Sequence, residues 1–211
     1  MRKEDIMPKL STEKKVLLDQ EIKEKVYKQA MQMLKENQSQ LFTMAELADR
    51  VELSKGTLYN YFKDKSEVIL FLNEKLTKKV FEDLRQELEQ TTDYKHGLRV
   101  AFRTFNQTMA EHYFLHVATL IISHEQMSEK KRTRLTEAPG RLLAPYMTDF
   151  FKRGIAAGVF KDLPVEYLSV FMAATMHGLS VLAGGFGQMA AKDFVAQSKA
   201  MEDLLVAALC R

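Results

Sequence analysis

The sequence predicts an all-α protein, and three observations lead to this prediction. Apolar residues recur at spacings of three and four along most of the chain, as they do on one face of a helix. No stretch alternates apolar and polar residues for long, and no Asn-Gly or Asp-Gly pair marks a hairpin turn. Glycine and proline interrupt helices, yet the first 96 residues contain only one glycine, Gly56, and one proline, Pro8.

The composition is that of an ordinary soluble chain of 211 residues, of which 46% are hydrophobic and 28% charged. The single cysteine, Cys210, excludes an intrachain disulfide and indicates a reducing compartment. The first residues lack the apolar segment of a signal peptide, and the longest uncharged run contains His177 and two adjacent glycines, which disfavours a membrane span. We therefore expect a cytoplasmic protein without a membrane partner. The net charge of +3 is too small to indicate nucleic-acid binding by itself.

Four helices are predicted in the N-terminal part of the chain, each from a local signal. A stripe that includes Ile22 and Val26 marks the first helix. Thr43, with Glu46 three residues later, forms a capping-box pattern at the start of the second, and Ser54 can cap the third. The fourth is long and heavily charged with one apolar stripe, as expected of a strut that connects two regions. The predicted ranges are 19–37, 43–51, 54–62 and 66–90.

Five further helices are predicted in the rest of the chain. Pro164 suits the first turn of one of them, and Gly184 with Gly185 suits its end. The predicted ranges are 94–113, 114–127, 137–158, 164–184 and 192–209. The basic run KKRTR at residues 130–134 falls between two of these helices, and we expect a solvated loop there.

The second and third helices are joined by a very short turn, which is typical of a helix-turn-helix. Leu58 and Phe62 lie one helical turn apart and are expected to pack the third helix against Leu47 and Val51. The other side chains of the third helix then face outward or sideways, and residues 53–63 contain no acidic residue.

These outward residues are weak helix formers, but they suit contact with DNA. Gly56 lets the backbone approach a phosphate or a base edge closely, and Thr57 offers a hydroxyl and a methyl group that can meet a thymine methyl. Tyr59 and Tyr61 can donate hydroxyls to phosphates. The lysines that supply positive charge are Lys55, Lys63 and Lys65. The alternative is a plain solvated helix whose tyrosines pack on a neighbour.

The stretch FTMAELADRVELSKGTLYNYFKDKSEVILFL resembles the N-terminal helix-turn-helix of TetR-type transcriptional regulators, and the close match runs over residues 26–72. The resemblance implies that the recognition helix contacts DNA through Lys55, Gly56, Thr57, Tyr59 and Tyr61. It also implies phosphate contacts from Thr43 and Lys65 at the starts of the second and fourth helices.

Two positions depart from that family, which usually has glycine where this chain has Gln38 and Glu52. Glu52 lies in the turn of the helix-turn-helix. We expect either that its backbone is forced toward the left-handed region or that the turn differs slightly in geometry.

The resemblance further implies a DNA-binding domain with an N-terminal arm at residues 1–65, followed by a helical domain at 66–211 that binds a ligand and dimerises. In such regulators the last two helices pair with those of a second subunit. This chain carries matching stripes there, Phe194, Met201, Leu205 and Ala208 in one helix and Phe171, Ala174 and Gly178 in the other. The alternative is that both are core helices of a single chain.

Aromatic, methionine and histidine side chains in the second domain are candidates for lining an apolar cavity. They are Phe102, Phe105, Met109, His112, His116, Phe150, Met172, Met176 and His177. Residues of these types at helical spacing are also typical of a core, and the sequence does not separate the two interpretations. The histidines are the polar residues that would orient an apolar or amphipathic ligand.

No catalytic, cofactor or metal site is predicted. His112 and His116 have the spacing of two zinc ligands on one helix face, but no third ligand stands at a matching turn. The sequence HEQMS, from His124, has Ser128 where a zinc-protease motif needs a second histidine. The glycines from Gly184 onward follow a helix and are expected to end it, not to cradle a phosphate.

Together these features predict a homodimeric, non-enzymatic regulator that binds a double-stranded DNA operator. We expect a repressor that a small apolar or amphipathic molecule releases from its operator. An activator or an architectural DNA-binding protein is a second possibility. The alternative from another class is a helical small-molecule-binding protein or enzyme without a DNA function, for which Lys55, Tyr59 and Tyr61 would be irrelevant.

Overall fold

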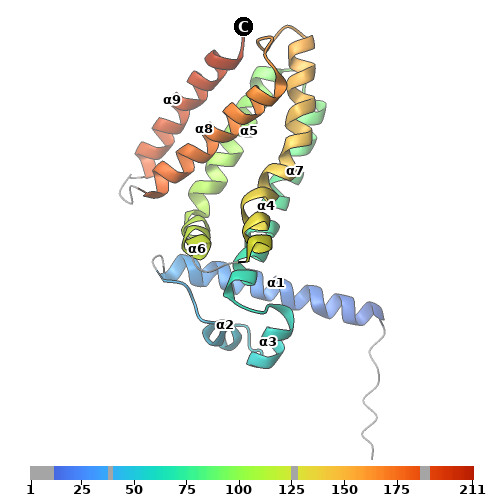
Figure 1. Cartoon of the computed structure of the whole chain (residues 1–211), viewed down its shortest axis with the longest axis vertical. Helices are drawn as coiled ribbons and strands as arrows, with labels where there is room; N and C mark the ends of the chain where they lie inside the picture. The colour runs from blue at the N-terminus through green and yellow to red at the C-terminus, as the bar shows by residue number, and fades with distance from the viewer. Residues whose placement is uncertain (1–11, 38–39, 125–127, 186–190) are drawn as a thin grey trace, which may run out of the picture. The chain divides into compact units, whose positions relative to one another are not determined.

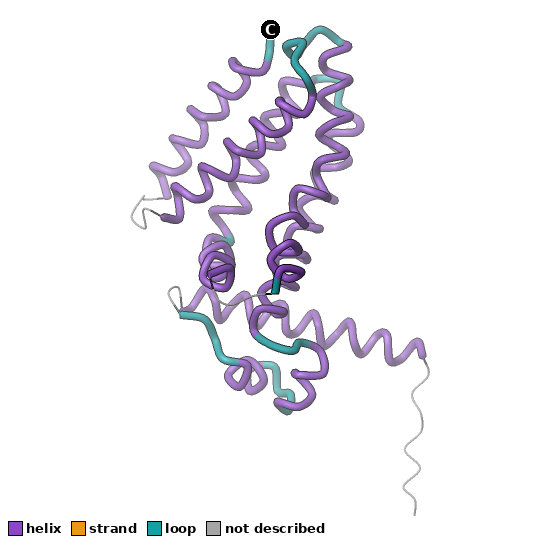
Figure 2. The backbone as a smooth tube through the Cα atoms, viewed as in Figure 1, coloured by secondary structure: helices purple, strands orange, loops and turns teal. Residues whose placement is uncertain are grey.

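The computed structural model describes residues 12–37, 40–124, 128–185 and 191–211, and within these ranges every regular element is an α-helix (Figures 1 and 2). The all-α prediction is therefore confirmed. The chain divides into two compact units, Met1–Val68 and Ile69–Arg211. The helices are α1 (Thr12–Asn37), α2 (Met44–Arg50), α3 (Lys55–Tyr61), α4 (Lys65–Gln90), α5 (Tyr94–Glu111), α6 (Tyr113–His124), α7 (Glu129–Ala156), α8 (Val165–Gly185) and α9 (Ala191–Leu209).

Two helices begin earlier than the sequence patterns predicted. α1 begins at Thr12 and not at residue 19, and its added turns leave Val16, Leu17 and Leu18 exposed. α7 begins at Glu129 and not at residue 137, because Ser128 caps it by accepting a hydrogen bond from the backbone N–H of Lys131. The prediction of a loop at residues 130–134 was therefore wrong, since this basic run belongs to α7. The predicted N-terminal arm lies outside the described residues.

The first unit has a small core under α2 and α3. Thr43 forms the predicted capping box, in which its side chain accepts from the Glu46 N–H while its own N–H donates to the Glu46 carboxylate. Ser54 caps α3 by accepting from the Thr57 N–H at 3.1 Å. The apolar side chains of these helices that are buried are Met44, Leu47, Ala48, Val51, Leu58 and Phe62.

The second unit is built around α5, which packs against α8 and α9, while α7 packs against α8 (Figure 1). Its core contains an aromatic cluster, in which the ring of Phe150 lies 5.8 Å from that of Phe151 and 5.5 Å from that of Phe160. Gly154 makes room for this cluster, since a Cβ atom there would stand 2.3 Å from the Phe160 ring. Gly158, with φ of +72°, lets the chain leave α7 in the left-handed conformation.

Two features of the sequence predictions change in the second unit. α5 ends at Glu111, and its C-cap His112 stands at the junction with α6, where the His112 carbonyl accepts from the His116 N–H at 3.4 Å. In α9, Leu205 is buried in the core of the same chain, whereas its neighbour Leu204 is 62% exposed. Of the predicted stripe, Leu205 therefore belongs to the core of its own chain, whereas Ala208 is exposed.

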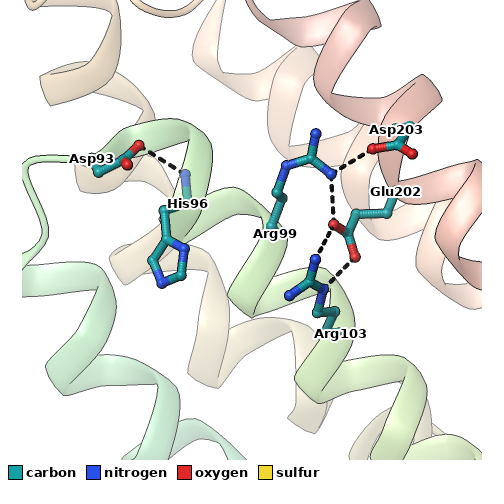
Figure 3. A network of polar contacts seen from close by, with 6 residues as sticks. All are labelled: Asp93, His96, Arg99, Arg103, Glu202 and Asp203. Atoms are coloured by element: carbon teal, nitrogen blue, oxygen red, sulfur yellow. Dashed lines mark hydrogen bonds and ion pairs between the residues drawn. The ribbon is translucent and has the colours of Figure 1, made fainter.

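A buried carboxylate joins α9 to α5. The side chain of Glu202 is 3% exposed and receives hydrogen bonds from Arg99 at 2.6 Å and from Arg103 at 2.6 and 2.8 Å (Figure 3). Asp203, which is more exposed, accepts a second bond from Arg99 at 2.6 Å. Burial opposes ionisation of Glu202, but the hydrogen bonds from Arg103 and Arg99 outweigh it and hold the pKa of this carboxyl below its usual value. The ionised form of Glu202 therefore stabilises the fold.

We expect Glu202→Gln to lower the free energy of unfolding at pH 7 by about 2 kcal/mol, because charge-assisted hydrogen bonds are lost from a buried position. The folded-state pKa of Glu202 is lowered, so the stabilisation is present above its unfolded-state value near 4.5 and disappears as the pH falls through the folded-state value. The difference between wild type and variant should then shrink in acid. Urea unfolding at pH 7 and at acidic pH measures it.

Asp203→Asn is the matched control for this prediction, because Asp203 also pairs with Arg99 but its side chain is 56% exposed. We expect it to change stability less than Glu202→Gln does. A Glu202→Gln chain that is as stable as wild type at pH 7, or a stability difference that does not vary with pH, would contradict the role given to Glu202.

Candidate nucleic-acid interface

The outer face of α3 carries the predicted contact residues. Leu58 is fully buried, and Phe62, which follows the helix, is 5% exposed, so α3 is held by one side. The opposite side presents Lys55, Gly56 and Tyr59 to solvent. Residues 53–63 contain no carboxylate, so no negative charge from this segment itself opposes an approaching phosphate.

The start of α3 is ordered by a local hydrogen-bond pair. The Ser54 hydroxyl accepts from the Thr57 N–H, and the two hydroxyl oxygens of Ser54 and Thr57 lie 2.8 Å apart. The hydroxyl of Thr57 is thus hydrogen-bonded within the protein, and its methyl group is the part of the side chain that remains for contact with a base. Gly56 lies between Ser54 and Thr57 in the chain, and the space beside its Cα atom is open. A Cβ atom there would meet only the Ser54 hydroxyl, at 3.9 Å.

Tyr61 differs from its predicted role as an outward phosphate donor. It is half-buried, and its hydroxyl donates a 2.6 Å hydrogen bond to Asp19 of α1. The hydrogen bond to Asp19 raises the pKa of Tyr61 above its usual value, with burial and the Asp19 charge acting in the same direction. Asp19 was not among the predicted site residues, because it lies 42 residues away in the sequence and no local pattern links the two.

The other two predicted phosphate contacts stand at helix starts. Thr43 is exposed, and its hydroxyl is used as the cap of α2. Lys65 is half-buried at the first position of α4. Hydrogen bonds from the backbone and side chain of Thr43 lower the pKa of the Glu46 carboxyl, so this cap is ionised at neutral pH.

Of the two alternatives expected at Glu52 in the turn between α2 and α3, the structure has the left-handed conformation, with φ of +56°. The Glu52 N–H donates to the Asp49 carbonyl, and the Leu53 N–H donates to the Ala48 carbonyl at 3.0 Å. Lys25 of α1 forms an ion pair with the Glu52 carboxylate, and this hydrogen bond and charge lower the pKa of Glu52. The other position that departs from the family, Gln38, lies outside the described residues.

A second ionic contact fixes α2 against α1. Arg50, in the last turn of α2, donates from Nη2 to both carboxylate oxygens of Glu36 at 2.7 and 2.8 Å, and from Nε to Gln29 at 3.2 Å. The capping box thus stabilises the start of α2, and the contacts of Arg50 hold its last turn against α1. α3 packs against the helix that is held in this way.

The ligand candidates of the second unit fall into three groups. Phe102, Phe150 and Met172 are buried in the core, and Phe105 packs against that core. His112 and His116 are half-buried around the α5–α6 break, where the His112 ring meets Phe114 edge-on at 5.9 Å. The side chains of Met109, Met176 and His177, and that of Phe194 in the proposed dimer stripe, lie outside the described residues.

No group of three or more histidine, cysteine or acidic side chains in the described ranges of the chain is arranged to hold a metal ion. Among the helices resolved in those ranges, none combines the length and the apolarity that crossing a lipid bilayer requires.

The sequence and the fold were compared with known proteins. Residues 26–71 match the family described as bacterial regulatory proteins, tetR family. No curated protein sequence matches the chain.

Solved structures share the fold at low sequence identity. The transcriptional regulator FadR from Bacillus subtilis in complex with stearoyl-CoA has a TM-score of 0.66 at 18% identity, covering 87% of this chain and 97% of its own. The ketosteroid transcriptional regulator KstR2 of Mycobacterium tuberculosis has a TM-score of 0.63 at 17% identity, covering 90% and 95%. A TetR family transcription regulator from Marinobacter aquaeolei VT8 has a TM-score of 0.58 at 18% identity, covering 92% and 98%.

The left-handed turn gives a prediction about stability. Glu52→Gly should raise the melting temperature by about 2–4 °C, because glycine adopts positive φ without the steric cost that a Cβ atom imposes. Differential scanning calorimetry measures this change.

Glu52→Gln is the control, because it removes the charge that pairs with Lys25 and keeps the side chain on the strained backbone. We expect it to leave the melting temperature nearly unchanged, since exposed ion pairs contribute little. If the glycine variant melts at or below the temperature of the glutamine variant, strain at this position is not significant.

Proposed function

We propose that this chain, whose helix-turn-helix belongs to the TetR family of transcriptional regulators, is a ligand-responsive DNA-binding regulator and acts as a repressor. The observation that carries the proposal is the exposed, acid-free face of α3, with Lys55, Gly56 and Tyr59 side by side on a helix held by the burial of Leu58. We assign DNA binding to residues 1–65 and ligand binding with dimerisation to residues 66–211.

Within this proposal the contact residues have different tasks. Lys55 and the lysines that follow α3 neutralise phosphates, which supports binding to any sequence. Tyr59, 49% exposed, offers a hydroxyl to the backbone of DNA. The methyl group of Thr57 and the bare backbone at Gly56 are the features suited to base edges. Tyr61 takes part either by exchanging Asp19 for a phosphate or by positioning α3 through that bond.

The proposed partner for α8 and α9 is a second copy of this chain. Both helices expose large apolar side chains, with Tyr167 68%, Val170 66% and Phe171 45% exposed in α8, and Leu204 62% exposed in α9. Ala174 and Gly178 continue the exposed stripe of α8, and small residues allow helices to approach closely. A helix-turn-helix that reads two half-sites needs two-fold symmetry, which a homodimer supplies.

The competing function is that of a helical carrier or enzyme without DNA binding. This function would not explain why the exposed face of α3 carries Lys55, Gly56 and Tyr59. The fold is shared with the regulators FadR and KstR2, and FadR has been solved with stearoyl-CoA, so small-molecule binding in the second unit also fits the comparison. DNA binding therefore separates the two functions, and ligand binding does not.

For DNA binding we predict that Gly56→Ala lowers affinity by about tenfold, equivalent to ~1.4 kcal/mol, because the added methyl group stands between the α3 backbone and DNA. The folded protein itself has room for this methyl group, and alanine is the better helix former, so the melting temperature should stay the same or rise. Fluorescence anisotropy with a fragment that the wild type selects from random DNA measures the affinity.

Two further lysine variants complete this test. Lys55→Ala should weaken binding and reduce the salt dependence by about one counterion. Lys78→Ala, at an exposed lysine in α4, should bind like wild type. The proposal fails if Gly56→Ala and Lys55→Ala both bind the selected fragment as tightly as wild type while remaining folded by circular dichroism.

For assembly we predict that the wild type has twice its 24.3 kDa chain mass in light scattering at micromolar concentration. Leu204→Glu should give monomers, because it places a charge in the middle of an apolar contact that buries above ~1,200 Å². Operator binding should weaken in the same variant, since one half-site contact is weak.

Leu17→Glu is the matched control for assembly, because Leu17 is a leucine of similar exposure, 58%, on a helix of the other unit. It should remain dimeric. A wild-type mass of one chain, or a Leu204→Glu chain that stays dimeric, would exclude α8 and α9 as the interface.

A further inference from the structure

An asparagine in the second unit is buried without a hydrogen-bond partner. Asn106, near the C-terminal end of α5, is 3% exposed. Neither its amide nitrogen nor its amide oxygen forms a hydrogen bond in the described part of the structure. A buried amide that forms no hydrogen bond costs about 1–3 kcal/mol of stability, so its presence needs an explanation.

The register of α5 against α9 shows where Asn106 lies. Arg103 donates to Glu202 (Figure 3), and Lys95, earlier in α5, donates to the carbonyl of Arg211, which follows α9, so the two helices run antiparallel. Asn106 is three residues beyond Arg103, on the same face of α5, and Ser198 is four residues before Glu202 on α9. Both therefore lie one helical turn beyond the Arg103–Glu202 contact, in the same direction along this helix pair.

Ser198, like Asn106, has a buried polar atom without a hydrogen-bond partner among the described residues. This atom is its hydroxyl oxygen. Glu202, one turn away, has both carboxylate oxygens hydrogen-bonded, to Arg103 and to Arg99. The unpaired polar atoms of Asn106 and Ser198 thus lie next to the ionic network, one helical turn further along α5 and α9.

The described neighbours of Asn106 along α5 include two apolar aromatic side chains. Phe102, one turn before Asn106, is fully buried, and Phe105, its neighbour in the chain, packs against the same core. The neighbouring network contains two arginines and two carboxylates, whose formal charges cancel. An amide offers one acceptor and two donor hydrogens, and a hydroxyl offers both roles, so this pair suits a group that is neutral and both donates and accepts.

We propose that Asn106 and Ser198 bind the neutral hydrogen-bonding head of a small molecule whose remaining part is apolar. The head is an amide, a hydroxyl or a similar group, and an ionised carboxylate is disfavoured, because Arg99 and Arg103 of the neighbouring network are already paired with Glu202 and Asp203. The proposal rests on the proposed function, since it specifies the ligand class and two contact residues of the regulatory site. Asn106 is kept at a cost to the stability of the ligand-free protein.

The test compares Asn106→Leu with wild type. Leucine has a similar volume and no polar atoms, so the ligand-free variant should melt about 3 °C higher than wild type. Decanamide, decan-1-ol and decanoate serve as probes in isothermal titration calorimetry at pH 8, where decanoate is ionised. Wild type should bind decanamide and decan-1-ol more tightly than decanoate, and Asn106→Leu should lose about tenfold in affinity for decanamide.

Asn73→Leu is the matched control, because Asn73 is a half-buried asparagine of the same unit whose amide donates to the Ile69 carbonyl at 2.9 Å and to the Thr119 hydroxyl at 2.8 Å. It should melt below wild type and bind decanamide unchanged. Ser198→Ala should also weaken decanamide binding.

Three results would overturn the proposal. The first is an Asn106→Leu chain that melts below wild type, which would show a structural use of the amide. The second is equal affinity of wild type and Asn106→Leu for decanamide. The third is the absence of binding by all three probes, which would exclude this ligand class. Anisotropy of wild type on its selected DNA fragment is measured separately, so failure of the regulator function is distinguished from failure of this site.

Discussion

The burial of Leu58 is the contact on which the candidate DNA interface depends. α3 has seven residues, which is too short to be stable as an isolated helix. Its only buried side chain is Leu58, and its other supports are the Ser54 cap and the bond from Tyr61 to Asp19. With one side fixed in this way, the remaining side of the helix needs no packing role, which explains why it can carry glycine and tyrosine.

Local signals were sufficient to predict this unit from the sequence. The capping box at Thr43 and the cap at Ser54 act within three residues, so the sequence shows them directly. The left-handed turn at Glu52 was one of two expectations, and the structure selects it. The bond between Tyr61 and Asp19 was not predictable, since its partners are brought together only by the packing of α1 against the helix-turn-helix.

The second unit was less predictable, because several of its features depend on phase and on long-range packing. Leu204 and Leu205 are adjacent leucines, and only the packing of α9 against α5 decides which of them is buried. The earlier start of α7 was missed, although Ser128 with Glu129 behind it is a recognisable helix start. Asn106 matches no motif, and its significance follows only from its burial and its unmade hydrogen bonds.

Glu202 and Asn106 show two solutions to placing a polar side chain between α5 and α9. Glu202 carries a charge into a buried position, and two arginines from α5 compensate for its loss of hydration. Asn106, one turn further along, has no such compensation from the described residues. The first arrangement holds the helix pair together, whereas the second lowers stability unless another molecule completes it. A cost of this kind at one point in an otherwise satisfied helix pair is typical of a functional position.

Within the second unit, α4 is linked by hydrogen bonds to α6 and α7. Asn73 of α4 donates to Thr119 of α6, and Glu74 accepts from Arg134 of α7. The far end of α4 is held by Arg153 of α7, which donates to the Leu88 carbonyl.

Lys65, in the other unit, begins this same continuous helix only two turns before Asn73. A displacement of α6 or α7 on ligand binding would therefore act on α4 close to its first turn. If a ligand favours the conformation that fits DNA poorly, DNA must weaken ligand binding by the same factor, and a coupling of ~1–3 kcal/mol suffices for a switch of roughly five- to hundredfold.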